Sequence, residues 1–263
     1  HKIEHRQHGV PTFADHVWLA FIAHVAHGGE FGPVEADALA RLERLIERQA
    51  QGRFVDYPTR SRAEDGQHGA SDIEYYDMVS SQGAGECLQW KGLPLFKTVY
   101  DFSLYPMLLW ALKPRTIIEL GSGAGASALW LADVATTFGE TPRVFSVDLS
   151  LPAMQDARIT FREGDCERID HVFTEGELRS ALHPWLVIED AHANVIGVLD
   201  FFHRYLQPGD YVVVEDSDGK HDEIGRFVAR YPRGYKVDTY YTDFFGRNAT
   251  SAQNAFLVRT ADQ

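Results

Sequence analysis

Two apolar segments of the chain, residues 185–189 and 211–215, end in acids that are directly followed by further acids. The carboxyl ends of neighbouring parallel strands meet at one edge of a sheet, so we expect these carboxylates to crowd together. Like charges this close raise one another's pKa, and a divalent cation is the simplest way to relieve the repulsion. An all-oxygen ligand set favours Mg²⁺, or Mn²⁺ as a substitute, over zinc. The pattern predicts a metal site whose ligands are Glu189, Glu215 and Asp216.

The same acids have a structural interpretation. Aspartate at the start of a helix is a common cap, and a charge at a strand end can simply be solvated. His192, three residues after Glu189, has two interpretations as well. It is either a structural histidine or a general base that works near neutral pH.

Residues 115–127 indicate a strand, a glycine turn and the start of a helix. Gly121, Gly123 and Gly125 alternate directly after a segment rich in β-branched residues. Such turns let a ligand approach the backbone, although the spacing alone also fits NAD or a plain tight turn. Glu119 would repel a phosphate beside the turn but not a cationic amino-acid group, which favours S-adenosylmethionine. Asp148 closes the next apolar segment, where a carboxylate that binds ribose is expected.

The composition favours an enzyme for small molecules. The chain has 263 residues, of which 44% are hydrophobic and 24% charged, and its formal charge is -13. That charge argues against a broad surface for nucleic acid or an anionic membrane. We see no membrane span or signal segment, and the two cysteines form no metal or disulfide pattern, so we expect a soluble, cytoplasmic protein.

Most of the chain alternates strands with helices, which predicts a doubly wound α/β sheet. Seven strands are expected, at residues 115–120, 144–148, 159–161, 185–189, 211–215, 235–241 and 255–259, and the last of them is expected to run antiparallel. Upstream, residues 13–27 and 33–51 have the pattern of amphipathic helices, and residues 52–71 have the composition of a linker. We therefore divide the chain into a helical arm with a linker, residues 1–71, and a catalytic domain, residues 72–263. The arm is a candidate for forming a homo-oligomer.

Three segments, PRTIIELGSGAGAS, HPWLVIEDAHAN and QPGDYVVVEDSD, together resemble the cephalosporin hydroxylase family, which acts in the C-7 methoxylation of cephalosporins. More distantly the chain is similar to the Mg²⁺-dependent macrolide-sugar O-methyltransferases. The resemblance covers roughly half of the chain and implies a Rossmann-like methyltransferase fold that binds S-adenosylmethionine. It implies that Asp165 and Cys166 contact the adenine edge. The residues expected around the methyl donor are then Glu119, Gly121, Ser122, Gly123, Gly125, Ser127, Asp148, Asp165 and Cys166.

Relatives carry an acid three residues before the histidine, and here that acid is Glu189 in place of the usual Asp, with Asp190 beside it. Either one could touch the metal. The leading hypothesis is a Mg²⁺-dependent O-methyltransferase for a hydroxyl on a small natural product, a sugar or an antibiotic core, with His192 as the base. One alternative is a metal-independent N-methyltransferase. Another is a donor-binding accessory protein for a partner oxygenase.

Overall fold

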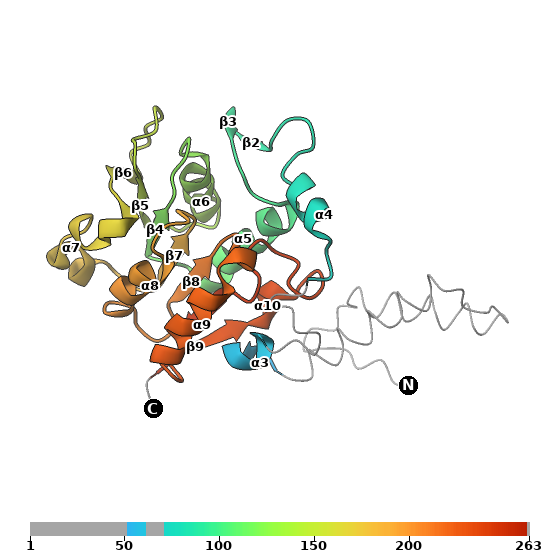
Figure 1. The fold of residues 1–263 in the computed structure, drawn as a ribbon. Coiled ribbons are helices and arrows are strands. Elements are labelled where there is room, and N and C mark those ends of the chain that lie inside the picture. The colour runs from blue at the N-terminus through green and yellow to red at the C-terminus, as the bar shows by residue number, and fades with distance from the viewer. Residues whose placement is uncertain (1–51, 62–70, 262–263) are drawn as a thin grey trace. The chain divides into compact units, whose positions relative to one another are not determined.

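A computed structural model of the chain describes residues 52–61 and 71–261. Within them, residues from Arg53 onward belong to one compact unit (Figure 1). The two helices predicted in residues 13–27 and 33–51 lie outside the described residues. No helix in the described part of the chain is both long enough and apolar enough to cross a membrane.

An eight-stranded sheet forms the centre of this unit, in the order β1-β9-β10-β8-β7-β4-β5-β6. The five strands from β4 to β8 run parallel, and β10 runs antiparallel to both of its neighbours. This confirms the predicted mostly parallel sheet with an antiparallel last strand. The strands are β1 (Phe54–Val55), β4 (Thr116–Leu120), β5 (Arg143–Asp148), β6 (Ile159–Glu163), β7 (Trp185–Glu189), β8 (Tyr211–Val214), β9 (Tyr235–Asp238) and β10 (Phe256–Arg259).

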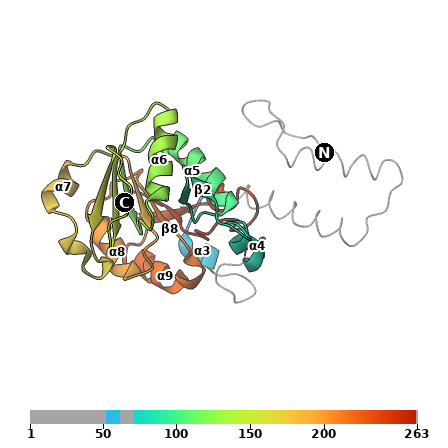
Figure 2. The same ribbon diagram turned by 90° about the horizontal axis from the view of Figure 1, so that it is seen from above.

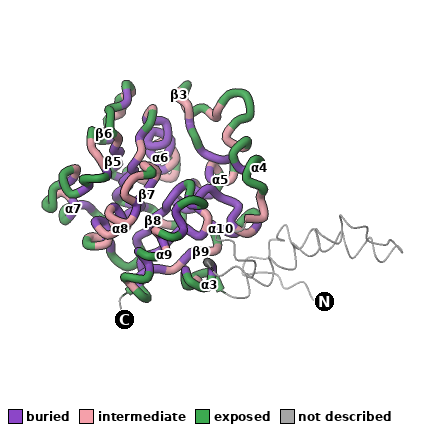
Figure 3. Tube along the Cα trace, in the orientation of Figure 1, coloured by how far each residue is buried: buried purple, intermediate pink, exposed green. Residues whose placement is uncertain are grey.

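Helices cover both faces of the sheet, with α5 and α6 packed together on one face and α8, α9 and η1 on the other (Figure 2). Buried residues are concentrated along the central strands and the inner sides of these helices (Figure 3). The helical elements are α3 (Tyr57–Ser61), α4 (Tyr75–Ser80), α5 (Val99–Leu112), α6 (Ala126–Thr137), η1 (Cys166–His171), α7 (Glu175–Ser180), α8 (Val195–His203), η2 (Ser217–Gly219), α9 (His221–Arg230) and α10 (Thr239–Thr242). A hairpin of β2 (Gln89–Trp90) and β3 (Leu93–Pro94) precedes α5.

Part of the predicted linker has regular structure. Residues 54–61 form β1 and α3, and β1 pairs antiparallel with β9. Arg53 holds this edge through two hydrogen bonds to the buried Asp238, at 2.8 and 2.7 Å. A strand of two residues has no readable periodicity, because its partner rather than its own sequence stabilises it.

The strand order changes direction between β4 and β7. The chain adds β5 and β6 on one side of β4 and then β7 and β8 on the other. Ligands of doubly wound folds bind at the carboxyl ends of the strands, at this kind of switch point. The glycine turn and the acidic strand ends all lie on this edge.

Candidate active site

The predicted glycine turn connects β4 to α6. The backbone has φ of +103° at Gly121 and +82° at Gly125, which is the left-handed region that glycine tolerates best. A Cβ atom added to Gly121 would lie 2.5 Å from the backbone oxygen of Asp190. We call this glycine turn, residues 121–125, the donor turn, because it is the segment predicted to bind the methyl donor. Gly121 allows it to lie directly against the acidic end of β7.

Glu119 is a buried carboxylate with one oxygen satisfied. The Ser146 hydroxyl donates to Oε2, whereas Oε1 has no hydrogen-bond partner among the described residues. Burial raises the pKa of Glu119 to about 7, against the opposing effect of the Ser127 and Ser146 hydroxyls. A buried acceptor without a partner is costly, so this oxygen is available to a donor group on a ligand.

Asp148 lies at the end of β5, opposite the glycine turn. The backbone N–H of Gly123 donates to Oδ2 at 2.8 Å, and that of Leu149 donates to Oδ1 at 2.7 Å. Ser122 joins the same region through its hydroxyl, 2.6 Å from the Ser146 hydroxyl. Ser127 is buried in the first turn of α6. The structure thus brings the predicted donor residues from β4, the turn and β5 together.

Asp165 and Cys166 follow the next strand, β6. The Asp165 carboxylate caps η1 by accepting from the Glu167 N–H at 2.9 Å, which is the structural role considered for strand-end acids. Cys166 is buried, and burial raises the pKa of its thiol to about 12. Its carbonyl accepts from the Asn194 side chain at 3.0 Å. The contact of Asp165 and Cys166 with adenine stays a prediction.

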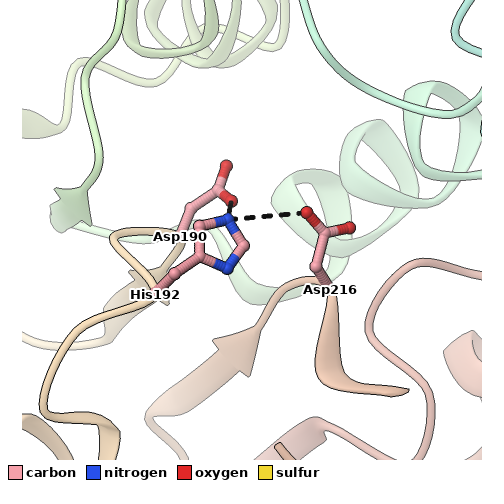
Figure 4. Close-up of side chains that lie close together, drawn as sticks. All are labelled: Asp190, His192 and Asp216. Atoms are coloured by element: carbon pink, nitrogen blue, oxygen red, sulfur yellow. Dashed lines mark ion pairs between the residues drawn. The ribbon is translucent and has the colours of Figure 1, made fainter. Parts of the chain in front are cut away.

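Asp190, His192 and Asp216 lie together at the ends of β7 and β8 (Figure 4). His192 Nε2 lies 3.5 Å from Asp190 Oδ1 and 3.6 Å from Asp216 Oδ2. One ligand atom from each residue falls within 4.8 Å of the others. Partial burial and the nearby Asp190 carboxylate raise the pKa of Asp216, and His192 opposes that rise. The effect of Asp190 is the like-charge repulsion that we predicted for acids at neighbouring strand ends.

Glu189 lies apart from this cluster, although it was predicted as a metal ligand. It is fully buried, and its Oε2 accepts from Lys220 Nζ at 2.8 Å. Its Oε1 accepts from the backbone N–H groups of Ala191 and His192 at 3.1 and 3.0 Å. In this structure Glu189 therefore holds the turn that presents Asp190 and His192.

Glu215, the second predicted ligand, is also buried and already has partners. Lys97 Nζ donates to Oε2 at 2.7 Å, and the Tyr105 hydroxyl donates to Oε1. Burial raises the pKa of Glu215 to about 8, although Lys97 lowers it. Lys97 also donates to Asp190 Oδ2 at 2.8 Å. Burial would lower the pKa of Lys97, but Asp190 and Glu215 outweigh it and raise that pKa well above its usual value.

The backbone is strained at two residues of the cluster. His192 has φ of +56° and Asp216 has φ of +44°, and neither is a glycine. A residue in this region costs about 1–3 kcal/mol, and such strain is concentrated at functional sites. The fold thus holds the backbone of two of the three cluster residues in a conformation that non-glycine residues adopt only at a cost.

Lys97 and Lys220, the two buried lysines that contact these acids, were not predicted from the sequence. We predicted a metal cation as the remedy for crowded acids, but Lys97 pairs with Asp190 and Glu215, and Lys220 pairs with Glu189. Lys97 has no other charged residue within three positions on either side in the sequence, a setting in which a buried lysine could have been suspected. The sequence left open whether Glu189 or Asp190 touches the metal. In the structure, Asp190 is the one that lies beside Asp216.

The fold and the donor turn define a Rossmann-like methyltransferase that uses S-adenosylmethionine. The model of the Rhamnosyl O-methyltransferase/CmcI family matches residues 83–260. This match covers more than half of the chain, which therefore belongs to that family and is an S-adenosylmethionine-dependent O-methyltransferase. The family resemblance inferred from the three sequence segments is confirmed.

Similar proteins extend over most of the chain. A rhamnosyl O-methyltransferase of Mycobacterium leprae (strain TN) is 28% identical over 208 residues, which is 71% of this chain and 89% of that protein. An apo structure of CmcI is 29% identical with a TM-score of 0.58, over 67% of this chain and 77% of that chain. A CmcI structure with Mg and SAM is 26% identical with a TM-score of 0.57, over 81% of this chain and 100% of that one.

Proposed function

We propose that this protein transfers the methyl group of S-adenosylmethionine to a hydroxyl of a small sugar-containing acceptor, with Mg²⁺ as the second cofactor. The single observation that carries the proposal is the cluster of Asp190, His192 and Asp216 beside the donor turn. Support for the cofactors comes from CmcI, whose structure contains Mg and SAM. Support for a sugar hydroxyl comes from the rhamnosyl O-methyltransferases among the relatives. The second candidate acceptor is a hydroxyl on an antibiotic core.

The donor atoms of the cluster fit a divalent cation. One carboxylate oxygen from Asp190 and one from Asp216 lie within 4.8 Å of each other, and Asp216 is about half exposed, so an ion can reach both oxygens while His192 Nε2 serves as the base. Asp190 Oδ1 and Asp216 Oδ2 would hold the ion. This keeps Asp216 from the predicted set. Asp190 replaces Glu189, which Lys220 and two N–H groups engage, and Glu215 is left out because Lys97 and Tyr105 engage it. When bound, Mg²⁺ would polarise the acceptor hydroxyl and lower its pKa.

His192 Nε2 takes the proton of the acceptor hydroxyl. The carboxylates of Asp190 and Asp216, at 3.5 and 3.6 Å, stabilise the imidazolium that forms. Glu119 Oε1 accepts from the ammonium of the donor's methionine part, and Asp148 accepts from its ribose hydroxyls. The acceptor oxygen forms a bond to the methyl carbon while the carbon–sulfur bond breaks. S-adenosylhomocysteine leaves as a neutral thioether.

A direct test is to incubate the purified protein with S-adenosylmethionine, Mg²⁺ and a panel of simple rhamnosides. We expect a mass gain of one methyl on the sugar, abolished by EDTA and restored by Mg²⁺. Activity that persists in EDTA would reject the metal mechanism. Methylation of amines alone, or no turnover without a partner oxygenase, would favour the corresponding alternative.

A further inference from the structure

Lys97 is a fixed cation at the edge of the proposed metal site. Its side chain is only 3% exposed, and the nearby Leu95 and Thr98 are buried, although the adjacent Phe96 is exposed. The N–H of Leu95 donates to the Leu88 carbonyl at 2.7 Å, and the Thr98 hydroxyl accepts from the Asp101 N–H at 3.0 Å. The backbone on both sides of Lys97 is therefore anchored, and its ammonium has a defined position.

The ammonium connects acids from two neighbouring strand ends. Lys97 Nζ lies 2.8 Å from Asp190 Oδ2 and 2.7 Å from Glu215 Oε2. Each carboxylate oxygen of Asp190 thus has a different partner. Oδ2 faces Lys97, whereas Oδ1 lies 3.5 Å from His192 Nε2. A carboxylate held by one oxygen cannot rotate freely, so its other oxygen keeps its direction.

We propose that Lys97 is a positioning residue for the metal: it holds Asp190 by Oδ2 so that Oδ1 stays directed toward His192 and Asp216. This inference rests on the proposed function and adds a residue that would not touch the ion. Residues that orient metal ligands typically change metal affinity about 10–100-fold when they are removed. Without Lys97, Asp190 would lose its orienting partner and the buried Glu215 would lose its cation.

Electrostatic repulsion between Lys97 and the metal ion would have the opposite effect on metal affinity, so the direction of the change distinguishes the two. An ammonium so close to a divalent ion also repels it, and that repulsion alone would make a variant without Lys97 bind the metal more tightly. The positioning role and the repulsion therefore predict opposite changes in affinity.

The experiment measures Mn²⁺ binding by titration with electron paramagnetic resonance, and S-adenosylhomocysteine binding by calorimetry. Lys97→Met leaves Glu215 buried without its cation and risks misfolding, so the decisive pair is Glu215→Gln and the double variant Lys97→Met/Glu215→Gln. Glutamine at 215 retains an oxygen that accepts from Tyr105, and this pair differs only at residue 97. A cooperative melting transition establishes that both variants are folded. S-adenosylhomocysteine affinity is compared at pH 8.5, where Glu119 is ionised, because Lys97 lowers the pKa of Glu119 and its loss would otherwise change donor binding.

We expect Mn²⁺ to bind about 10–100-fold more weakly to the double variant than to Glu215→Gln. Equal or tighter Mn²⁺ binding would overturn the positioning role while leaving the proposed function intact. If the unaltered protein itself bound no Mn²⁺, the metal site and the positioning role would both be wrong.

Discussion

His192 Nε2 lies 3.6 Å from Asp216 Oδ2, although the two residues follow different strands of the sheet. The parallel pairing of β7 with β8 brings them together, because it aligns Glu189 with Val214 and so places both strand ends at one level. The proposed chemistry depends on this alignment.

Replacing His192 tests the base. We chose His192→Asn because asparagine tolerates the left-handed backbone that this position adopts. Loss of a general base lowers turnover about 10²–10⁴-fold, and kcat should fall while S-adenosylhomocysteine affinity is retained. Unchanged kcat would remove His192 from the mechanism.

The binding of the donor should depend on pH through Glu119. Its pKa is raised to about 7 by burial, with Lys97 and Asp190 also acting on it in opposite directions. The ionised carboxylate is the form that would bind the donor's ammonium, so affinity for S-adenosylhomocysteine should fall as pH drops below 7. Calorimetry between pH 5.5 and 8.5, roughly the range in which such a group titrates, would measure this.

Glu119→Gln is the matched control for that experiment. It keeps the size of the side chain but cannot titrate, so its affinity should be lower and independent of pH over the same range. If Glu119→Gln retained the full pH dependence, another group would be responsible.

Gly121→Ala should disrupt the contact between the donor turn and β7. Both Gly121 and Gly139 have positive φ, but a Cβ atom at Gly139 meets nothing within 4 Å, whereas at Gly121 it meets the backbone of Asp190. Gly139→Ala should therefore cost only the backbone strain, about 1 kcal/mol. We expect Gly121→Ala to cost at least about 1 kcal/mol more in urea unfolding and to weaken donor binding. Equal effects of the two substitutions would mean that the turn adapts.

The Arg162–Glu177 pair predicts a loss of stability in acid. The hydrogen bond from Arg162 lowers the pKa of Glu177 to about 2, so the folded state favours the ionised carboxylate. That contribution is present above the unfolded pKa of about 4.3 and is lost as pH falls from there toward 2. Both side chains are partly exposed, so we expect Glu177→Gln to cost only about 1 kcal/mol at pH 7.

Glutamine at position 177 can retain the capping box with Thr174, so this substitution isolates the charge. The free energy of unfolding of Glu177→Gln should converge with that of the unaltered protein near pH 2. A gap of the same size at pH 7 and pH 2 would show that the cap or the packing, and not the ion pair, accounts for the difference.

The central strands were predictable because their sequences carry the signal of burial on both faces. Residues 185–189 (WLVIE) form β7 with the predicted bounds, and β8 covers residues 211–214 of the predicted 211–215. Residues 235–241 were predicted as one strand, but β9 ends at Asp238, whose side chain caps α10 by accepting from the Tyr240 N–H. An aspartate followed by threonine was the available signal for that change.

The site was less predictable, because side-chain direction decides it. Glu189 and Asp190 are adjacent in sequence, yet Glu189 is directed to Lys220 and Asp190 to Lys97 and His192. The charged partners come from segments far apart in sequence; Lys97, for example, lies just before the N-cap of α5, more than 90 residues before Asp190. No periodicity in the chain indicates which acid meets a lysine and which remains available to a ligand.

The proposed metal site is tested most directly by the position of Mn²⁺ in crystals grown with S-adenosylhomocysteine, located by its anomalous scattering. We predict one anomalous peak within coordination distance of Asp190 and Asp216, with the nucleoside on the glycine turn between Glu119 and Asp148. A peak elsewhere, or a bound nucleoside with no peak near these two carboxylates, would contradict it.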